Sequence, residues 1–381
     1  MSDKKLHIVL IGNYRKDHQR SMILFLQMLK DGYTANGHNV DVWLPTTFFG
    51  VLSGNTLSGI GKWLAYLDKY ILFPLVLKWR CIKPQYAQSR FHICDHSNAV
   101  YVPYLPYNRT LVTCHDVLAI KGAFGDKSVF CDASRAGKVL QNWILKSLLK
   151  AGKIATVSQT TLIHLNELAQ NNKKPGAKWQ VVLNAFNEPF GELPKEISDD
   201  VLKQAGLNLT DGFMLHVGSG LPRKNRKMLL KMLNLLRNDW RGSVVFAGQA
   251  IDPELQSLIQ YYQLEDRVVS VVNPDFNLLQ TLYSACDAFV FPSYSEGFGW
   301  PVIEAQACGA CVLASDFPAI CEVGGEAALY AQADDAPKFA DNFREVLKPE
   351  VQQQLNSKAQ QNILRFDKQN MIENYIKLIQ E

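Results

Sequence analysis

Short apolar runs alternate with longer amphipathic stretches along most of the chain, and this alternation predicts strands separated by helices. In the first half, apolar residues recur at helical spacing over 21–35 and 136–150. Runs as apolar as Leu6–Ile11 are typical of parallel strands that are covered on both faces. The expected strands of this half are 6–11, 40–44, 91–94, 111–114, 154–157 and 181–183.

A second alternation follows a segment at 187–194 that contains Pro189, Gly191 and Pro194, which we interpret as a linker. Its expected strands are 213–217, 243–247, 268–272, 288–291 and 311–314, and its expected helices are 228–236, 253–263, 277–285, 301–308 and about 368–380. Two such series predict an α/β protein with two doubly wound, Rossmann-like parallel-sheet domains facing each other across a cleft. We expect domains at 1–190 and 191–365, and a C-terminal helix within 366–381 that packs back on the first domain.

The composition is that of an ordinary globular protein, but the charge is unevenly distributed. Of 381 residues, 47% are apolar and 20% are charged. Residues 1–190 hold 23 Lys and Arg against 11 Asp and Glu (+12), whereas residues 191–381 hold 17 against 25 (−8), which returns the net +4. A basic half indicates an acidic partner. The chain has neither an arginine-rich stripe nor zinc-finger spacing, so we expect no nucleic acid.

Residues 58–83 interleave aromatic and aliphatic side chains with Lys62, Lys69, Lys78, Arg80 and Lys83. One interpretation is an amphipathic segment that rests on an anionic membrane. The alternative is one or two packed helices with a basic solvent face, and Pro74 interrupts the pattern.

The expected cellular location of the protein and its expected metal content follow from simpler features of the sequence. The first residues lead directly into an expected strand, no apolar run is long enough to cross a membrane, and most of the eight cysteines lie in apolar runs. We therefore expect a cytoplasmic protein with peripheral contact at the inner face of the membrane. Cys308 and Cys311 lack a second pair at zinc-site spacing, and no Asp-x-Asp triplet is present, so neither a metal nor another cofactor is expected.

The strongest chemical signal is the segment 291–304, in which a strand end, a glycine-rich loop and a helix start follow one another. Pro301 stands at an expected first helical position, so the helix would point free N–H groups at a ligand, as a diphosphate requires. Glu296 and Glu304 add two carboxylates, which accept hydrogen bonds strongly from sugar hydroxyls. The competing interpretation is that Glu296 caps a turn and Glu304 is a solvated helix residue.

Two further segments follow strand ends. In 216–225, Gly218 and Gly220 permit close approach of a ligand, and Arg223 and Lys224 could neutralise a diphosphate. In 113–116, His115 is either a cleft residue or a core histidine, and Asp116 has the features of a turn or cap residue. Gly12 ends the first strand but lacks a dinucleotide fingerprint around it. The segment 95–98 is an acceptor-side candidate.

The segment 291–304 resembles the Glu-x7-Glu motif of family 4 glycosyltransferases, which have the GT-B fold, and the similarity continues through 305–309, 312–315 and 318–329. The resemblance implies that Glu296 binds the donor sugar and Glu304 the ribose. It also implies that His115 contacts the transferred sugar and that Lys224 and Arg223 bind phosphate. Many members carry an arginine where Ser219 stands. The implied candidate substrate contacts also include Gly297, Phe298, Gly299, Gly218, Ser219, Gly12 and Asp116.

The resemblance further implies a retaining, metal-independent transferase of surface-polysaccharide synthesis. It would move a sugar, with mannose as the first expectation, from a GDP- or UDP-sugar to a glycan or lipid-linked acceptor. The alternatives are a GT-B-like sugar-nucleotide epimerase or synthase and a non-catalytic nucleotide-sugar-binding protein. A dehydrogenase is the third alternative, but the first strand–turn–helix lacks the G-x-G-x-x-G motif.

Overall fold

The computed structural model describes residues 5–54, 56, 59–170 and 176–381 and divides the chain into two compact units. The first unit comprises 1–124, 133–187 and 368–381, and the second comprises 125–132 and 188–367. The expectation of a cytoplasmic protein rests partly on the first residues of the chain, and residues 1–4 lie outside the described residues. Residue 58 of the basic aromatic segment 58–83 also lies outside them.

The first unit is built on a six-stranded parallel sheet in the order β2-β1-β3-β4-β5-β6. Its strands are β1 (His7–Ile11), β2 (Asn39–Trp43), β3 (Arg90–Ile93), β4 (Thr110–Cys114), β5 (Lys153–Thr156) and β6 (Lys178–Val181). Its helices are α1 (Arg20–Ala35), α2 (Gly59–Leu67), α3 (Phe73–Cys81), α4 (Leu118–Ala123), α5 (Arg135–Leu148), α6 (Gln159–Ala169) and α15 (Lys368–Gln380). The strand order reverses between β1 and β3.

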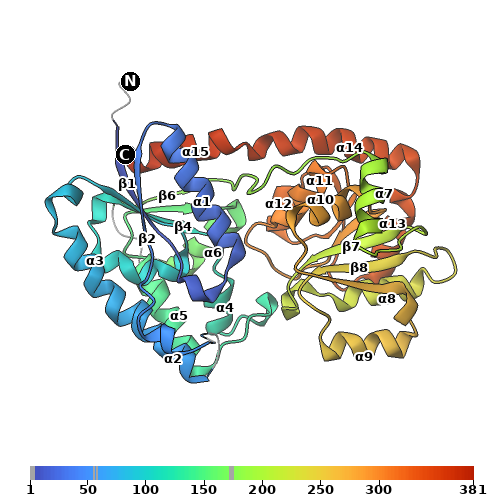
Figure 1. The fold of residues 1–381 in the computed structure, drawn as a ribbon, viewed down its shortest axis with the longest axis horizontal. Helices are drawn as coiled ribbons and strands as arrows, with labels where there is room; N and C mark the ends of the chain where they lie inside the picture. The colour runs from blue at the N-terminus through green and yellow to red at the C-terminus, as the bar shows by residue number, and fades with distance from the viewer. Residues whose placement is uncertain (1–4, 55, 57–58, 171–175) are drawn as a thin grey trace. The chain divides into compact units, whose positions relative to one another are not determined.

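A chain of buried polar groups fixes the last helix, α15, to this unit. Tyr33 on α1 bonds His92 Nδ1 at 2.9 Å, His92 Nε2 bonds the Thr113 hydroxyl at 2.7 Å, and Thr113 bonds Tyr375 of α15 at 3.2 Å. Lys153 Nζ donates to the last turn of α15, at the carbonyl of Ile379. The helix lies beside α1 and against β4 and β5 (Figure 1).

The second unit carries another six-stranded parallel sheet, in the order β12-β11-β10-β7-β8-β9. Its strands are β7 (Phe213–Gly218), β8 (Ser243–Gly248), β9 (Val268–Val272), β10 (Ala288–Phe291), β11 (Val312–Ser315) and β12 (Ala328–Ala331). Its helices are α7 (Lys195–Gln204), α8 (Lys227–Leu235), α9 (Pro253–Tyr262), α10 (Phe276–Ala285), α11 (Trp300–Ala307), α12 (Pro318–Gly324), α13 (Ala336–Val346) and α14 (Pro349–Asn362). This order reverses between β7 and β10.

Apolar side chains cover both faces of the second sheet. On one face, residues such as Met214, Phe246 and Val290 pack against α8, α9 and α13. On the other face, Tyr283 of α10 packs edge-on against Phe289 of β10. Because both faces of the sheet are covered, a ligand can reach it only at the strand ends. The reversal of strand order between β7 and β10 is where a ligand is expected.

Except for β6, expected at 181–183, the predicted strands and helices agree with the structure to within one or two residues, and the architecture of two doubly wound sheets is confirmed. Helix α7 was not predicted. Three further predictions differ from the structure. No helix or strand was predicted between the strand at 311–314 and the helix at 368–380, but residues 318–362 form α12, β12, α13 and α14. Pro74 does not end the helical run, because it stands where the π-helical turn Asp68–Leu72 meets α3 and the backbone hydrogen-bond pattern changes. Residues 125–132 group with the second unit.

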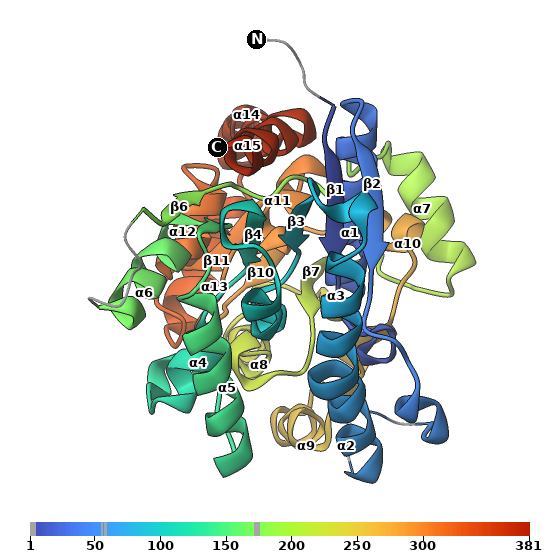
Figure 2. The same ribbon diagram turned by 90° about the vertical axis from the view of Figure 1, so that its left-hand side faces the viewer.

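The basic aromatic segment folds as α2, a π-helical turn η3 (Asp68–Leu72) and α3, in direct succession (Figure 2). Its exposed side chains include both apolar residues, such as Ile60 and Trp63, and the basic residues Lys62 and Lys78. Within the described part of the chain, no helix combines the length and hydropathy that a bilayer crossing requires.

Two buried histidines predict how the stability of the fold depends on pH. Burial lowers the pKa of His92 and of His216 from 6.5 to about 3, so both stay neutral in the native protein. Below pH 6.5 the unfolded chain binds protons at these residues that the native state does not. Stability is therefore present in full above that pH and decreases as the pH falls.

We expect the free energy of unfolding to fall by roughly 1 kcal/mol per pH unit for each histidine below about pH 6.5. Urea titrations at a series of pH values would measure it. His92→Asn should remove the share of this slope that belongs to one histidine. A stability that stays constant down to about pH 5 would contradict the buried neutral state of these rings.

Candidate functional site

The loops that follow β7 and β10 meet at the reversal point of the second sheet. The backbone N–H of Tyr294, in the loop after β10, donates to the carbonyl of Arg223, in the loop after β7, at 2.8 Å. Asn225 has a left-handed backbone (φ +51°), and its amide donates to the carbonyls of Pro292 and Ala333. The two sequence motifs, 72 residues apart, therefore form one structural unit.

The centre of this site is a carboxylate held between two cations. Lys224 Nζ lies 2.6 Å from Glu296 Oε1, and Arg223 Nη1 lies 2.7 Å from Glu296 Oε2. The Arg223 guanidinium also donates to the carbonyl of Ser295 at 3.0 Å. The Lys224 ammonium lies 4.9 Å from the centre of the Phe291 ring, in a cation–π contact.

The charges of this cluster follow from burial and pairing together. Glu296 is only 7% exposed, and burial by itself would raise the pKa of its carboxyl. Lys224 and Arg223 outweigh that effect and hold the pKa of Glu296 below its ordinary value, so the carboxylate is ionised. Burial lowers the pKa of Lys224, and the contact with Glu296 opposes this shift. The cluster carries one net positive charge.

Next to this cluster begins helix α11, whose N-terminus is formed by Gly299 at φ +105°. A left-handed backbone of this kind favours glycine, since a side chain would be strained there. Pro301 lies in the first turn, as the sequence predicted. The start of α11 and the two cations together make an environment that suits an anion.

Glu304 lies further along α11 and is buried, at 6% exposed. The hydroxyl of Tyr283, on α10, donates to Glu304 Oε2 at 3.0 Å. Burial and the nearby carboxylate raise the pKa of Tyr283 well above its ordinary value, so the hydroxyl stays a donor. Glu304 is thus a fixed, buried acceptor and not the solvated helix residue of the competing interpretation.

The remaining candidates on this unit have different surroundings. Phe298 is 4% exposed, and its ring packs edge-on against Trp300 and Phe366, so only its backbone is available to a ligand. Gly218 ends β7 at φ +157°, and a side chain on its neighbour in β8, Gly248, would meet the Gly218 carbonyl at 2.5 Å. Gly297 and Ser219 lie in the two loops that contain the cluster.

The segment 125–132 supports the loop after β10. The hydroxyl of Ser295 donates to the carbonyl of Val129 at 2.8 Å. Phe130, also in a left-handed conformation (φ +51°), stacks on the ring of Tyr294 with the ring centres 4.0 Å apart. The residue before Glu296 is therefore held by a segment distant in sequence, which no local pattern indicated.

On the first unit, His115 follows β4 and is 8% exposed. Its Nε2–H donates to the carbonyl of Cys94 at 3.0 Å, and its ring packs edge-on against Phe25. Burial lowers its pKa, so the imidazole is neutral. Asp116 accepts the N–H of Leu118 at the start of α4. Gly12 packs closely against Leu26, because a Cβ at this position would meet the end of the Leu26 side chain at 2.2 Å and displace it.

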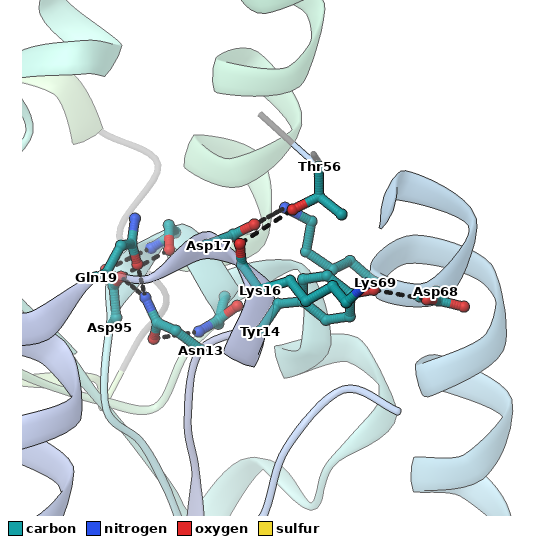
Figure 3. A network of polar contacts seen from close by, with 11 residues as sticks. Asn13, Tyr14, Lys16, Asp17, Gln19, Thr56, Asp68, Lys69 and Asp95 are labelled. Atoms are coloured by element: carbon teal, nitrogen blue, oxygen red, sulfur yellow. Dashed lines mark hydrogen bonds and ion pairs between the residues drawn. The ribbon is translucent and has the colours of Figure 1, made fainter. Parts of the chain in front are cut away.

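The reversal point of the first sheet holds a polar cluster that the sequence indicated only in part. Asn13 follows β1 and donates to Asp95, which follows β3, at 2.6 Å (Figure 3). Asn98 donates back to Asn13 at 2.8 Å, and Ser97 N–H donates to Asp95. The segment 95–98 was an expected acceptor-side candidate, whereas Asn13 was not. Its position directly after β1 at a reversal point was the signal available.

No group of three or more His, Cys, Asp or Glu side chains that could hold a metal ion occurs among the residues that the structure describes.

Comparison with known proteins shows which proteins this chain is similar to. Residues 198–363 match the model of the family described as Glycosyl transferases group 1. Over 312 residues the chain is 32% identical to O-antigen chain mannosyltransferase B of Escherichia coli, covering 77% of this chain and 76% of that protein. Over 236 residues it is 29% identical to O-antigen chain mannosyltransferase RfbU of Salmonella typhimurium, covering 61% of each. The second alignment thus spans less than two thirds of that relative.

The fold as a whole resembles that of sucrose-phosphate synthase from Thermosynechococcus elongatus. The TM-score is 0.74, and the comparison covers 99% of this chain and 98% of that one at 19% identity. At this identity the likeness concerns the fold alone.

The contact between Tyr283 and Glu304 predicts an unequal effect of removing two tyrosine hydroxyls. Tyr283→Phe removes a hydroxyl that donates to a buried carboxylate and should lower the free energy of unfolding by about 1.5–3 kcal/mol. Tyr330→Phe is the matched control, because the hydroxyl of Tyr330 donates to a neutral carbonyl, that of Gly325, at 2.7 Å. It should cost about 0.5–1.5 kcal/mol. Denaturant titrations of both variants would compare them, and an equal or smaller loss for Tyr283→Phe would contradict the assignment.

Proposed function

Because the chain belongs to the glycosyl transferases group 1, we propose that it is a retaining, metal-independent hexosyltransferase of family 4. The donor in this proposal is a nucleoside-diphosphate sugar, with GDP-mannose as the first choice and UDP-sugars as the alternative. The observation that carries the proposal is the buried carboxylate of Glu296, ion-paired to Lys224 and Arg223 where the second sheet reverses its strand order.

The donor diphosphate binds at the start of α11, close to Lys224 and Arg223. An ammonium has three donors and a guanidinium five, so contact with one carboxylate does not exhaust either group. Glu296 orients the sugar by accepting its hydroxyl hydrogen bonds, and Glu304 accepts those of the ribose. The fixed geometry of Glu304 beside Tyr283 supports this role, since a held acceptor loses little freedom on binding.

In the proposed reaction the acceptor hydroxyl attacks the anomeric carbon from the face that the diphosphate leaves. The bond from that carbon to the phosphate oxygen breaks as the new glycosidic bond forms. The hydroxyl proton passes to a phosphate oxygen of the departing nucleotide. Lys224 and Arg223 stabilise the negative charge that develops on this leaving group, which is the role that a metal ion plays in other enzymes. His115, neutral and at the end of β4, is the proposed contact to the transferred sugar.

The acceptor in this proposal is a glycan or a lipid-linked saccharide of surface-polysaccharide synthesis. The names of the two relatives, both O-antigen chain mannosyltransferases, support the glycan class and mannose as the sugar. The charge of +12 in residues 1–190 favours an anionic acceptor such as a lipid diphosphate. We place the protein in the cytoplasm, in peripheral contact with the inner face of the membrane.

A substitution at Glu296 tests the assignment of the site. Glu296→Gln keeps the shape of the side chain but removes its charge, and we expect the rate of sugar transfer to fall by about 10²–10³-fold. Glu326→Gln, on an exposed glutamate of the same unit, is the control and should leave the rate unchanged. Circular dichroism would establish that both variants are folded. Transfer at the wild-type rate by Glu296→Gln would remove the central assignment.

A panel of GDP-, UDP- and ADP-sugars tests the metal and stereochemical parts of the proposal. We expect one donor class to raise the melting temperature in the presence of a chelator, and Arg223→Ala with Lys224→Ala to weaken its binding by at least about tenfold. The product anomer, assigned by NMR, should match the donor. Dependence on added Mg²⁺ would contradict metal independence, and an inverted linkage would contradict retention. Nucleotide release without an acceptor-dependent product would favour the epimerase or synthase alternative.

A further inference from the structure

The described part of the segment 58–83 presents an unusual surface. The structure has a continuous helical run from α2 through η3 to α3, over residues 59–81. Six large apolar side chains on this run and Ile82 directly after it face solvent, with exposures from 38% for Leu67 to 80% for Ile60. We call this row the apolar stripe: Ile60, Trp63, Leu67, Ile71, Leu75, Trp79 and Ile82. Successive members are three or four residues apart, so the stripe follows one side of the run over about 33 Å.

The π-helical turn keeps this stripe straight. In an α-helix a series at every fourth residue drifts around the axis, because four residues exceed one turn of 3.6. Leu67, Ile71 and Leu75 form such a series, and η3 lies in its middle. A π-turn has i→i+5 hydrogen bonds and rotates less per residue, which returns Leu75 and Trp79 to the side of Ile60 and Trp63.

A buried aspartate holds a second apolar element beside the stripe. Asp68 in η3 is fully buried and accepts the backbone N–H groups of Phe48, Phe49 and Gly50 and the hydroxyl of Tyr14. These contacts fix the short helix η2 (Phe49–Leu52) against α2.

A lysine holds η2 from a second direction. Lys16 Nζ donates to the carbonyls of Gly50 and Ser53 at 2.7 and 2.9 Å. Three further apolar side chains are thereby held in solvent, because Phe48, Val51 and Leu52 are each more than 60% exposed.

The exposed charges along the stripe are positive, and Lys69 is ion-paired with the half-buried Asp17 at 3.0 Å. Residues 59–83 contain five Lys or Arg and a single acidic residue, Asp68, which is buried. Lys62 and Lys78 are exposed, and Lys83 lies over the Trp79 ring with its Nζ 3.6 Å from the ring centre. An apolar row with tryptophan at both ends and lysine along its flanks is the composition of a helix that lies in a membrane interface.

We propose that the apolar stripe, together with η2, inserts into the surface of an anionic lipid bilayer and docks the protein there. The apolar side chains enter the boundary between head groups and acyl chains, while Lys62 and Lys78 contact lipid phosphates. The proposal deepens the proposed function, on which it rests for the lipid-linked acceptor, by naming the surface through which the enzyme reaches the membrane.

Vesicle co-sedimentation of the full chain tests the proposal without any transfer reaction. The probes are phosphatidylcholine vesicles with and without phosphatidylglycerol. We expect the wild-type protein to bind the anionic vesicles, and high salt to weaken this binding. Ile71→Ser and Leu75→Ser, singly, should each reduce the partition coefficient by about tenfold. Lys62→Ser and Lys78→Ser should each reduce it by about fivefold, on anionic vesicles only.

Matched controls come from equally exposed apolar residues of the second unit. Leu364 and Val272 are 73% and 53% exposed, so Leu364→Ser and Val272→Ser make the same chemical change elsewhere and should leave vesicle binding unchanged. Donor binding, measured by thermal shift, should be the same in all of these variants.

Three results would overturn the docking surface. The first is wild-type binding that does not depend on phosphatidylglycerol. The second is stripe variants that bind like the wild type. The third is a dimer, detected by sedimentation velocity, that stripe substitutions dissociate, which would assign the surface to a second copy. A protein that binds vesicles but transfers no sugar would refute the proposed function and leave the surface intact.

Discussion

The second unit depends on a single electrostatic constraint. The carboxylate of Glu296 is almost fully buried, so positive charges must lie in direct contact with it. Glu296 meets this constraint with Lys224 and Arg223, which come from another strand end. The contact therefore fixes the loop after β10 relative to the loop after β7. The backbone bond from Tyr294 to Arg223 and the side chain of Asn225 reinforce the same junction. A buried charge left alone here would be costly, so the three residues act as one group.

Both sheets place polar residues at the point where their strand order reverses, but the two clusters differ in character. In the second unit the cluster is ionic, and the start of α11 adjoins it. In the first unit Asn13, Asp95 and Asn98 form a hydrogen-bonded network with amide and carboxylate groups. Amides and carboxylates are groups that bind neutral hydroxyls well, whereas paired cations suit phosphates. The two similar sheets thus present different polar groups at their reversal points.

Sequence reasoning was strongest where a residue's neighbours along the chain determine its surroundings. The strand–loop–helix order around Pro301 predicted the start of α11 correctly, and the sequence singled out Glu296 and Glu304, two acids that the structure buries. It was weakest where contacts come from distant segments. Tyr283 beside Glu304, Val129 beside Ser295 and Asn13 beside Asp95 are separated by 21, 166 and 82 residues, respectively. No local periodicity encodes such pairs.

The segment around Pro74 shows a further limit. Composition alone did not show which side of this segment faces water. The membrane-facing segment and the packed helices with a basic solvent face are both consistent with the same residues. The answer depends on the five-residue π-turn Asp68–Leu72, which shifts the helical phase between α2 and α3.

That turn has a consequence for sequence variation in this region. Because the turn sets the helical phase between α2 and α3, deleting one residue from either of these helices would rotate everything that follows by roughly 100°, carrying the later members of the row around the axis while their identities stay the same. The number of residues in this helical run is therefore constrained as strongly as their apolar character. A homologous chain could tolerate exchange of isoleucine for leucine far more readily than the loss of a single residue.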